Sequence, residues 1–105
     1  NSRPMKKIIA TALLLTNLSV YSLSPNEMLV IIGAVKYYNE HCAGLSPKGM
    51  HKMNKGLKRF DMDSTPIHIL ELNNLAISGY KTAEKFGCTG TKDEARKAGY
   101  GHYIN

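Results

Sequence analysis

Residues 24–42 read SPNEMLVIIGAVKYYNEHC. The first four form a capping box, with Ser24 as the N-cap, Pro25 in the first turn and Glu27 three residues after the serine. The apolar residues that follow recur every three or four positions, as one face of a helix requires: Met28, Ile31, Ile32, Val35, Tyr38 and Cys42. Gly44 then supplies a natural end. The stretch predicts an amphipathic helix that buries one face against a neighbour.

Two further helices are predicted by the same pattern of a Ser/Thr-Pro start and an apolar face. The second begins at Ser46-Pro47, and its apolar side consists of Met50, Met53, Leu57 and Phe60. The third is expected from Thr65-Pro66 to Gly87, and its apolar positions are Ile69, Leu72, Ala76, Gly79, Ala83 and Phe86. A second capping box at residues 91–94 predicts a short last helix that ends near Gly99. The expected fold class is all-α, a small three- to four-helix bundle with an up-down-up arrangement.

The two cysteines of the chain support this topology. Cys42 and Cys88 stand at the expected ends of the first and third helices, and in an up-down-up bundle these ends lie at the same pole. We therefore predict a Cys42–Cys88 disulfide. We interpret it as structural, because redox-active pairs are usually spaced Cys-x-x-Cys.

The N-terminal 22 residues have the composition of an export signal. Residues 1–4 precede Met5 and are interpreted as an expression scar or an upstream leader. Residues 5–22 then combine a positive start, an apolar run of about 13 residues and small residues before a possible cleavage after Ser22, the three parts of a bacterial signal peptide. The run is shorter than the roughly 20 residues of a stable transmembrane span, and retention of the segment as a helix is the alternative. Residues 23–105 form the expected single helical domain, in a periplasmic or secreted protein.

The charge argues against a nucleic-acid partner. The chain of 105 residues has a formal charge of +6, but Arg3, Lys6 and Lys7 contribute three of its positive charges within the first 22 residues. The rest holds 11 basic and 8 acidic residues, a net +3. Domains of this size that bind nucleic acid are usually far more basic.

Two short patterns resemble a catalytic thiol pair and a calcium-binding loop, but their geometry or spacing excludes both kinds of site. His41-Cys42 pairs a base with a thiol, but adjacent residues of a helix point about 100° apart, and an oxidised cysteine is no nucleophile. Asp61-Met62-Asp63 begins like a calcium loop, but Pro66 stands where that loop needs glycine and Leu72 where it needs glutamate.

Metal and phosphate motifs are also incomplete. The histidines lack the spacing of a metal site: His41, His51, His68 and His102. The glycine-rich residues 87–92 lack the spacing of a phosphate-binding loop. We therefore predict no catalytic residues, no metal and no cofactor.

The second predicted helix carries a basic stripe opposite its apolar side. Its members are Lys48, Lys52, Lys55, Lys58 and Arg59. It is either a solvated face or a docking surface for an acidic protein or an anionic envelope polymer or lipid.

The first predicted helix has a second apolar stripe whose packing partner the sequence does not identify, and the role of the C-terminal tail is also left open. Val30, Ala34 and Tyr37 repeat at helical spacing and need a neighbour: the third or last helix, the tail, a retained N-terminal helix or a second chain, so a homodimer is possible. If exposed, the stripe is a binding surface. The aromatic tail, residues 100–104, suits either a folded-back cover or a contact arm.

These features favour a small exported, non-enzymatic protein-binding module. The plan of a signal peptide, about 80 helical residues and one disulfide is similar to that of small bacterial envelope proteins, among them periplasmic immunity proteins and acid-stress chaperones. The first hypothesis is an inhibitor or immunity-like protein whose partner is acidic or envelope-associated. The alternatives are an accessory subunit of a secretion or conjugation machine, a host-facing secreted factor, and a periplasmic acid-stress chaperone.

Overall fold

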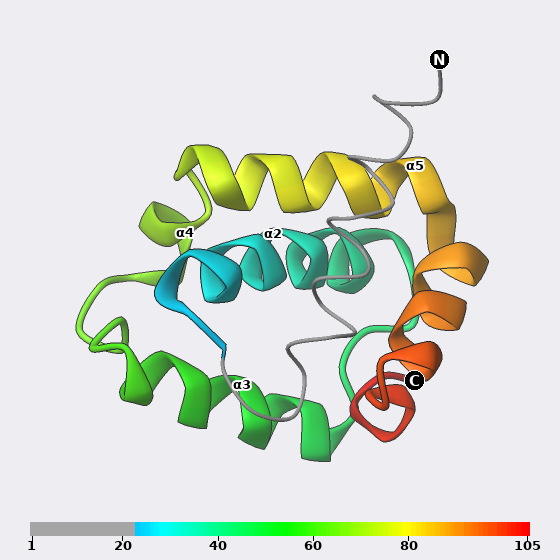
Figure 1. Ribbon diagram of the computed structural model, residues 1–105, viewed down its shortest axis with the longest axis horizontal. Helices are drawn as coiled ribbons and strands as arrows, with labels where there is room; N and C mark the ends of the chain where they lie inside the picture. Colours follow the sequence, from blue (N-terminus) through cyan, green and yellow to red (C-terminus); the bar gives the residue numbers. More distant parts are fainter. Residues whose placement is uncertain (1–22) are drawn as a thin grey trace.

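The computed structural model describes residues 23–105; the predicted segments 1–4 and 5–22 lie outside this range. The elements are α2 (Pro25–His41), α3 (Pro47–Arg59), α4 (Ile67–Leu70), α5 (Asn74–Lys97) and the 3₁₀ helix η1 (Gly101–Tyr103). In Figure 1, α2 and the first part of α5 run side by side in the same direction, and α3 runs the opposite way. The predicted all-α, up-down-up bundle with one disulfide is confirmed.

The starts of the first two helices match their sequence signals. The backbone N–H of Glu27 donates to Ser24 Oγ at 3.2 Å, and Ser24 N–H donates to Glu27 Oε1 at 2.6 Å, which completes the capping box. At α3, Gly49 N–H donates to Ser46 Oγ at 3.1 Å. Both caps are local hydrogen bonds, so residues only a few positions apart are enough to predict them.

The predicted third helix is interrupted, contrary to expectation. Residues 65–86 do not form one helix, because α4 ends at Leu70 and α5 begins at Asn74. Asn73 caps α5 by accepting the N–H of Leu75 at 2.8 Å, and this local bond competes with a continuous helix. In consequence Ile69 and Leu72, predicted as part of the apolar face, are 47% and 68% exposed.

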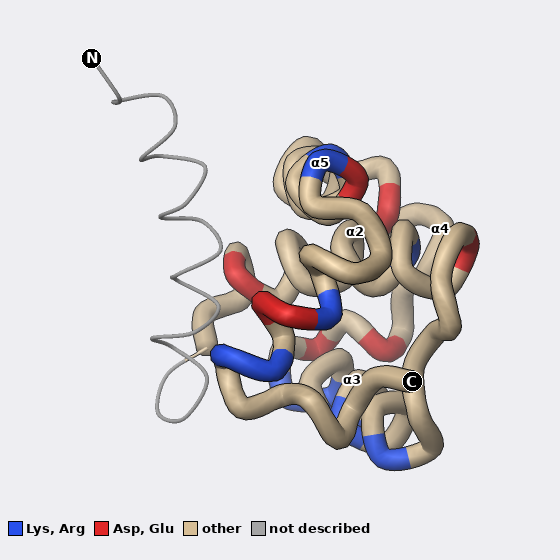
Figure 2. The backbone as a smooth tube through the Cα atoms, turned by 90° about the vertical axis from the view of Figure 1, so that its right-hand side faces the viewer, with Lys and Arg blue, Asp and Glu red and all other residues tan. Residues whose placement is uncertain are grey.

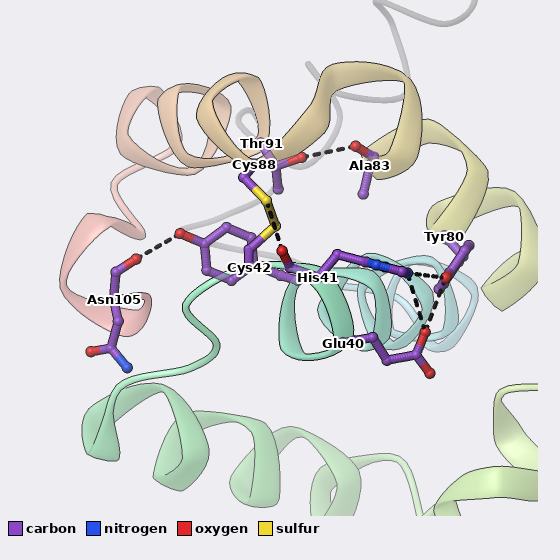
Figure 3. Close-up of a disulfide and its surroundings, with 9 residues drawn as sticks. Glu40, His41, Cys42, Tyr80, Ala83, Cys88, Thr91 and Asn105 are labelled. Atoms are coloured by element: carbon purple, nitrogen blue, oxygen red, sulfur yellow. Dashed lines mark hydrogen bonds and ion pairs between the residues drawn. A yellow bond between two sulfur atoms is a disulfide. The ribbon is translucent and has the colours of Figure 1, made fainter.

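The predicted last helix is joined to α5 across a kink. Gly87 has φ 73° and ψ −176°, and the helix resumes directly after it and continues to Lys97. The predicted stop at Gly87 is therefore confirmed. The prediction that Thr91 caps the helix that follows is wrong, because its hydroxyl donates to the carbonyl of Ala83 at 3.1 Å and so bridges the kink (Figure 3). The expected end is confirmed, since the C-cap is Ala98 and Gly99 follows with φ 85°.

Small residues bring α2 and α5 into backbone contact. A β-carbon on Gly33 would lie 1.6 Å from the carbonyl oxygen of Ala76, and one on Gly79 would lie 2.0 Å from that of Val30. Beside this crossing, a buried cluster collects side chains from α2, α5 and the loop after α3: Met28, Ile32, Met62 and Ala76.

The disulfide and the tail close the other end of the bundle. Cys42 and Cys88 are bonded, with their Cα atoms 5.5 Å apart. The tail folds back onto the connection between α2 and α3: Ser46 N–H donates to the carbonyl of Tyr103, and Asn105 N–H to that of Gly44, both at 2.9 Å. Of the two roles left open for the tail, the structure therefore supports the folded-back cover.

Candidate functional site

The basic stripe lies on the solvent side of α3. All five of its residues are exposed, and α3 contains no acidic residue. Within residues 23–105 none of the five forms an ion pair; the ion pairs there involve Lys36, His41, Arg96 and Lys97. Figure 2 shows the blue Lys and Arg segments along α3. We call this surface the basic face.

An apolar groove of about 510 Å³ runs beside the basic face. It exists because α2 packs closely along α5, whereas the backbone of α3 comes near the tail helix η1 instead. Side chains and backbone of α2, α3, α5 and the tail line it, including Val30, Ala34, Tyr38, Met53, Ala83 and Phe86.

The basic face is divided by this groove. Lys52, Lys55 and Arg59 line the groove, whereas Lys48 and Lys58 do not. On the opposite wall Glu94 also lines the groove, but its carboxylate is paired with Lys97 at 3.3 Å. One edge of the groove therefore carries a positive charge that no neighbouring carboxylate of residues 23–105 offsets.

The second apolar stripe of α2 is divided too. Val30 and Ala34 line the groove. Tyr37 is only 9% exposed and packs edge-on against the ring of Tyr80, with 5.6 Å between the ring centroids. Of the neighbours considered for this stripe, α5 therefore covers Tyr37, whereas Val30 and Ala34 line the groove.

A polar cluster ties α2 to α5 near the disulfide (Figure 3). The Tyr80 hydroxyl donates to Glu40 Oε1 at 2.9 Å and lies 3.0 Å from His41 Nε2, while Lys36 forms an ion pair with Glu40 at 2.8 Å. The hydrogen bonds from Lys36 and Tyr80 lower the pKa of Glu40. The bond to Glu40 raises the pKa of Tyr80, which keeps the phenol protonated. This arrangement clamps two helices together, and Cys42 beside it is held in the disulfide.

A further surface was not predicted from the sequence. Four large aliphatic side chains between residues 67 and 77 are exposed: Ile67, Ile69, Leu72 and Ile77. Helical spacing had assigned Ile69 and Leu72 to a buried face, and the turn at Asn73 exposes them instead. The four residues lie within eleven positions of the chain, which makes this segment a candidate interaction surface.

No protein family model, no curated protein and no solved structure matches the chain. In the part that the structure describes, no three His, Cys, Asp or Glu side chains are grouped so that they could hold a metal ion. No helix of residues 23–105 is both long and apolar enough to cross a bilayer.

Proposed function

We propose that the chain is an exported, non-enzymatic binding module that docks an acidic protein partner through α3. One observation carries the proposal. Five cations stand on a helix of 13 residues that has no acid, and none of them is paired with a carboxylate within residues 23–105.

The spacing of these cations explains why the basic face would bind an acidic surface. Lys48 and Lys52, and likewise Lys55 and Arg59, stand four positions apart, where like charges on a helix repel each other. An acidic surface would relieve this repulsion and accelerate encounter by electrostatic steering. Such a module would act by covering its partner, as an inhibitor or an immunity-like protein does.

Export is supported by two independent features. Residues 5–22 have the composition of a signal peptide, and a Cys42–Cys88 disulfide is typical of an oxidising compartment such as the periplasm. Expression of the full chain in a bacterium, followed by fractionation and mass measurement, tests this. We expect a periplasmic or secreted species whose mass fits cleavage after Ser22 and one disulfide; an uncleaved, reduced cytoplasmic species would contradict it.

Docking is tested by capture of partners on the full chain, at low salt and in 0.5 M salt. We expect one acidic partner in stoichiometric amount, and expect it to be lost with Lys52→Glu/Lys55→Glu and with Lys48→Glu/Lys58→Glu. Lys81→Glu/Lys85→Glu is the matched control, since it reverses two exposed lysines of α5. Capture that is unchanged by the α3 variants would remove the basic face from the proposal.

A second candidate function is an accessory subunit of an envelope machine. It is favoured by the exposed aliphatic residues between 67 and 77, which lie outside the basic face. Recovery of a large membrane complex, lost with Ile69→Ser/Leu72→Ser rather than with the α3 variants, would support this function. Recovery of unfolded clients at acid pH alone would instead support a stress chaperone.

A further inference from the structure

We infer that the groove between α3 and the α2–α5 pair binds a single-chain anionic lipid of the fatty-acid class. This site overlaps the protein-docking surface proposed above at Lys52, Lys55 and Arg59, which line the groove, but it differs in its ligand and in its apolar lining. The inference rests on the shape of the groove, its lining and the charge along one edge.

Two glycines of α3 set the shape of the groove. A β-carbon on Gly49 would lie 1.9 Å from the carbonyl oxygen of Tyr103, and one on Gly56 would lie 2.9 Å from Cε of Met28. These contacts fix α3 against the tail and against α2 at two points, about 10 Å apart along the helix. The tail is itself held by backbone hydrogen bonds to residues 44 and 46, so the groove is built by packed and hydrogen-bonded elements.

The lining matches a hydrocarbon chain. Aliphatic and aromatic side chains of three helices face the groove, among them Val35, Met53 and Phe86. The hydroxyl of Tyr38, another lining residue, is already used in a bond of 2.6 Å to the backbone oxygen of Asn105. Among residues 23–105 no buried side-chain nitrogen or oxygen lacks a hydrogen-bond partner, so the groove holds no buried polar group that would need a polar ligand.

The volume matches one chain. At roughly 25–30 Å³ per non-hydrogen atom, the space that a water molecule takes in the liquid, a groove of about 510 Å³ holds about 17–20 atoms. This is the size of a fatty acid of 14–18 carbons, and well below half that of a diacyl lipid. A docked helix of ten residues, roughly 15 Å long and 10 Å wide, would leave more than half of its volume outside.

The cations along one edge of the groove favour a lipid with a negatively charged head group. Lys52, Lys55 and Arg59 line the groove and are exposed, so a carboxylate can meet them at the solvent boundary while the chain lies inside. Such charge-assisted bonds do not require burial of an ion. The pattern of an apolar interior with cations at one edge complements an amphiphile with a negative head.

Displacement of the fluorescent fatty acid cis-parinaric acid from the full, disulfide-bonded chain tests the inference. Competitors are fatty acids of 8, 10, 12 and 16 carbons below their micelle concentrations, with hexadecanol as the uncharged control. We expect each added methylene to raise the affinity about three- to fourfold over this series. Hexadecanol is expected to bind at least tenfold more weakly than palmitate.

Matched variants locate the site. Lys52→Gln/Lys55→Gln should weaken palmitate binding at least tenfold, whereas Lys48→Gln/Lys58→Gln, outside the groove, should change it less than twofold. Ala34→Phe fills the groove and should abolish binding; Ala43→Phe places the same side chain at an exposed position outside it and should not. If Ala34→Phe fails to fold, the chain-length series on the unmodified protein still tests whether the groove binds fatty acids.

Several results would overturn the inference. These are no displacement by monomeric fatty acids, equal affinity for all chain lengths, or equal loss in the two lysine pairs. Binding only to vesicles of anionic diacyl lipid would indicate a membrane-surface site instead. Displacement seen only after removal of residues 1–22 would instead support the inference for the cleaved form that the export proposal expects. Loss of fatty-acid binding leaves the protein-docking proposal intact, because that proposal also requires Lys48 and Lys58.

Discussion

Gly33 and Ala76 meet backbone to backbone where α2 lies against α5. Because a β-carbon at residue 33 would fall 1.6 Å from the carbonyl oxygen of Ala76, no side-chain rotation can make room for it. Gly33→Ala must therefore separate the two helices. We expect a loss of about 3 kcal/mol in the free energy of unfolding, the upper end of the usual range for overpacking, measured by urea denaturation.

A second Gly→Ala change provides the control. At Gly101 the new β-carbon would meet Cγ of Arg96 at 3.1 Å, and that exposed side chain can move away. Gly101→Ala is expected to change stability by less than about 0.5 kcal/mol. Equal effects of the two substitutions would contradict a tight crossing at Gly33.

Gly87 is required for a different reason. Its φ of 73° and ψ of −176° lie in a region that is open essentially to glycine alone. A β-carbon there would meet nothing within 4 Å, so the cost of Gly87→Ala is conformational rather than steric. We expect a loss of about 1–3 kcal/mol by urea denaturation. Thr89→Ala, at an exposed helical position two residues on, should be close to neutral, and neutral behaviour of both variants would argue against the kink.

The disulfide should supply a large share of the stability. Cys42 and Cys88 are 46 positions apart, and in the chain-entropy model a loop of this length is worth about 4 kcal/mol. The folded domain has a small buried cluster, so this is a substantial fraction of the 5–15 kcal/mol typical of domains. Cys42→Ser/Cys88→Ser should lower the free energy of unfolding by about that amount. A change below about 1 kcal/mol would show that the bridge is incidental.

The helix starts that were predicted correctly from the sequence, those of α2 and α3, are fixed by local chemistry. Ser24 and Ser46 cap α2 and α3 through bonds that span only three residues, so the start of each helix is visible in the sequence. The basic face follows in the same way from helical spacing. The break at Asn73 was missed because Ile69, Leu72 and Ala76 keep a helical repeat across it, although the chain turns there.

The groove could not be predicted from the sequence. Its width depends on how far α3 stands from α2, and that distance is set by contacts of Gly49 with Tyr103 and of Gly56 with Met28. These pairs are far apart in the chain, and periodicity within one helix carries no information about them. For the same reason the division of the basic face into groove-lining and outer cations appears only in the folded protein.

The cluster around Glu40 predicts a specific titration. The hydrogen bond from Lys36 is the largest cause of the lowered pKa of Glu40, and the bond from Tyr80 is the next. Lys36→Met should therefore raise the pKa of Glu40 further towards its ordinary value than Tyr80→Phe does. The shift of the Glu40 carboxyl carbon, followed by NMR against pH, measures this. Lys85→Met removes a lysine that does not contribute to the shift and should leave the titration unchanged.

The same shift has a consequence for stability. A carboxyl whose pKa is lower in the folded state stabilises the fold above its unfolded-state pKa, and the stabilisation disappears as the pH falls through the folded-state pKa. Both Lys36 and Glu40 face solvent, so this contribution is small. We expect acid unfolding of Lys36→Met to follow that of the unmodified protein closely while the NMR titration of Glu40 moves. A large loss of stability of this variant at neutral pH, disappearing in acid, would mean that the cluster carries more of the α2–α5 contact than the packing of Gly33 and Gly79 implies.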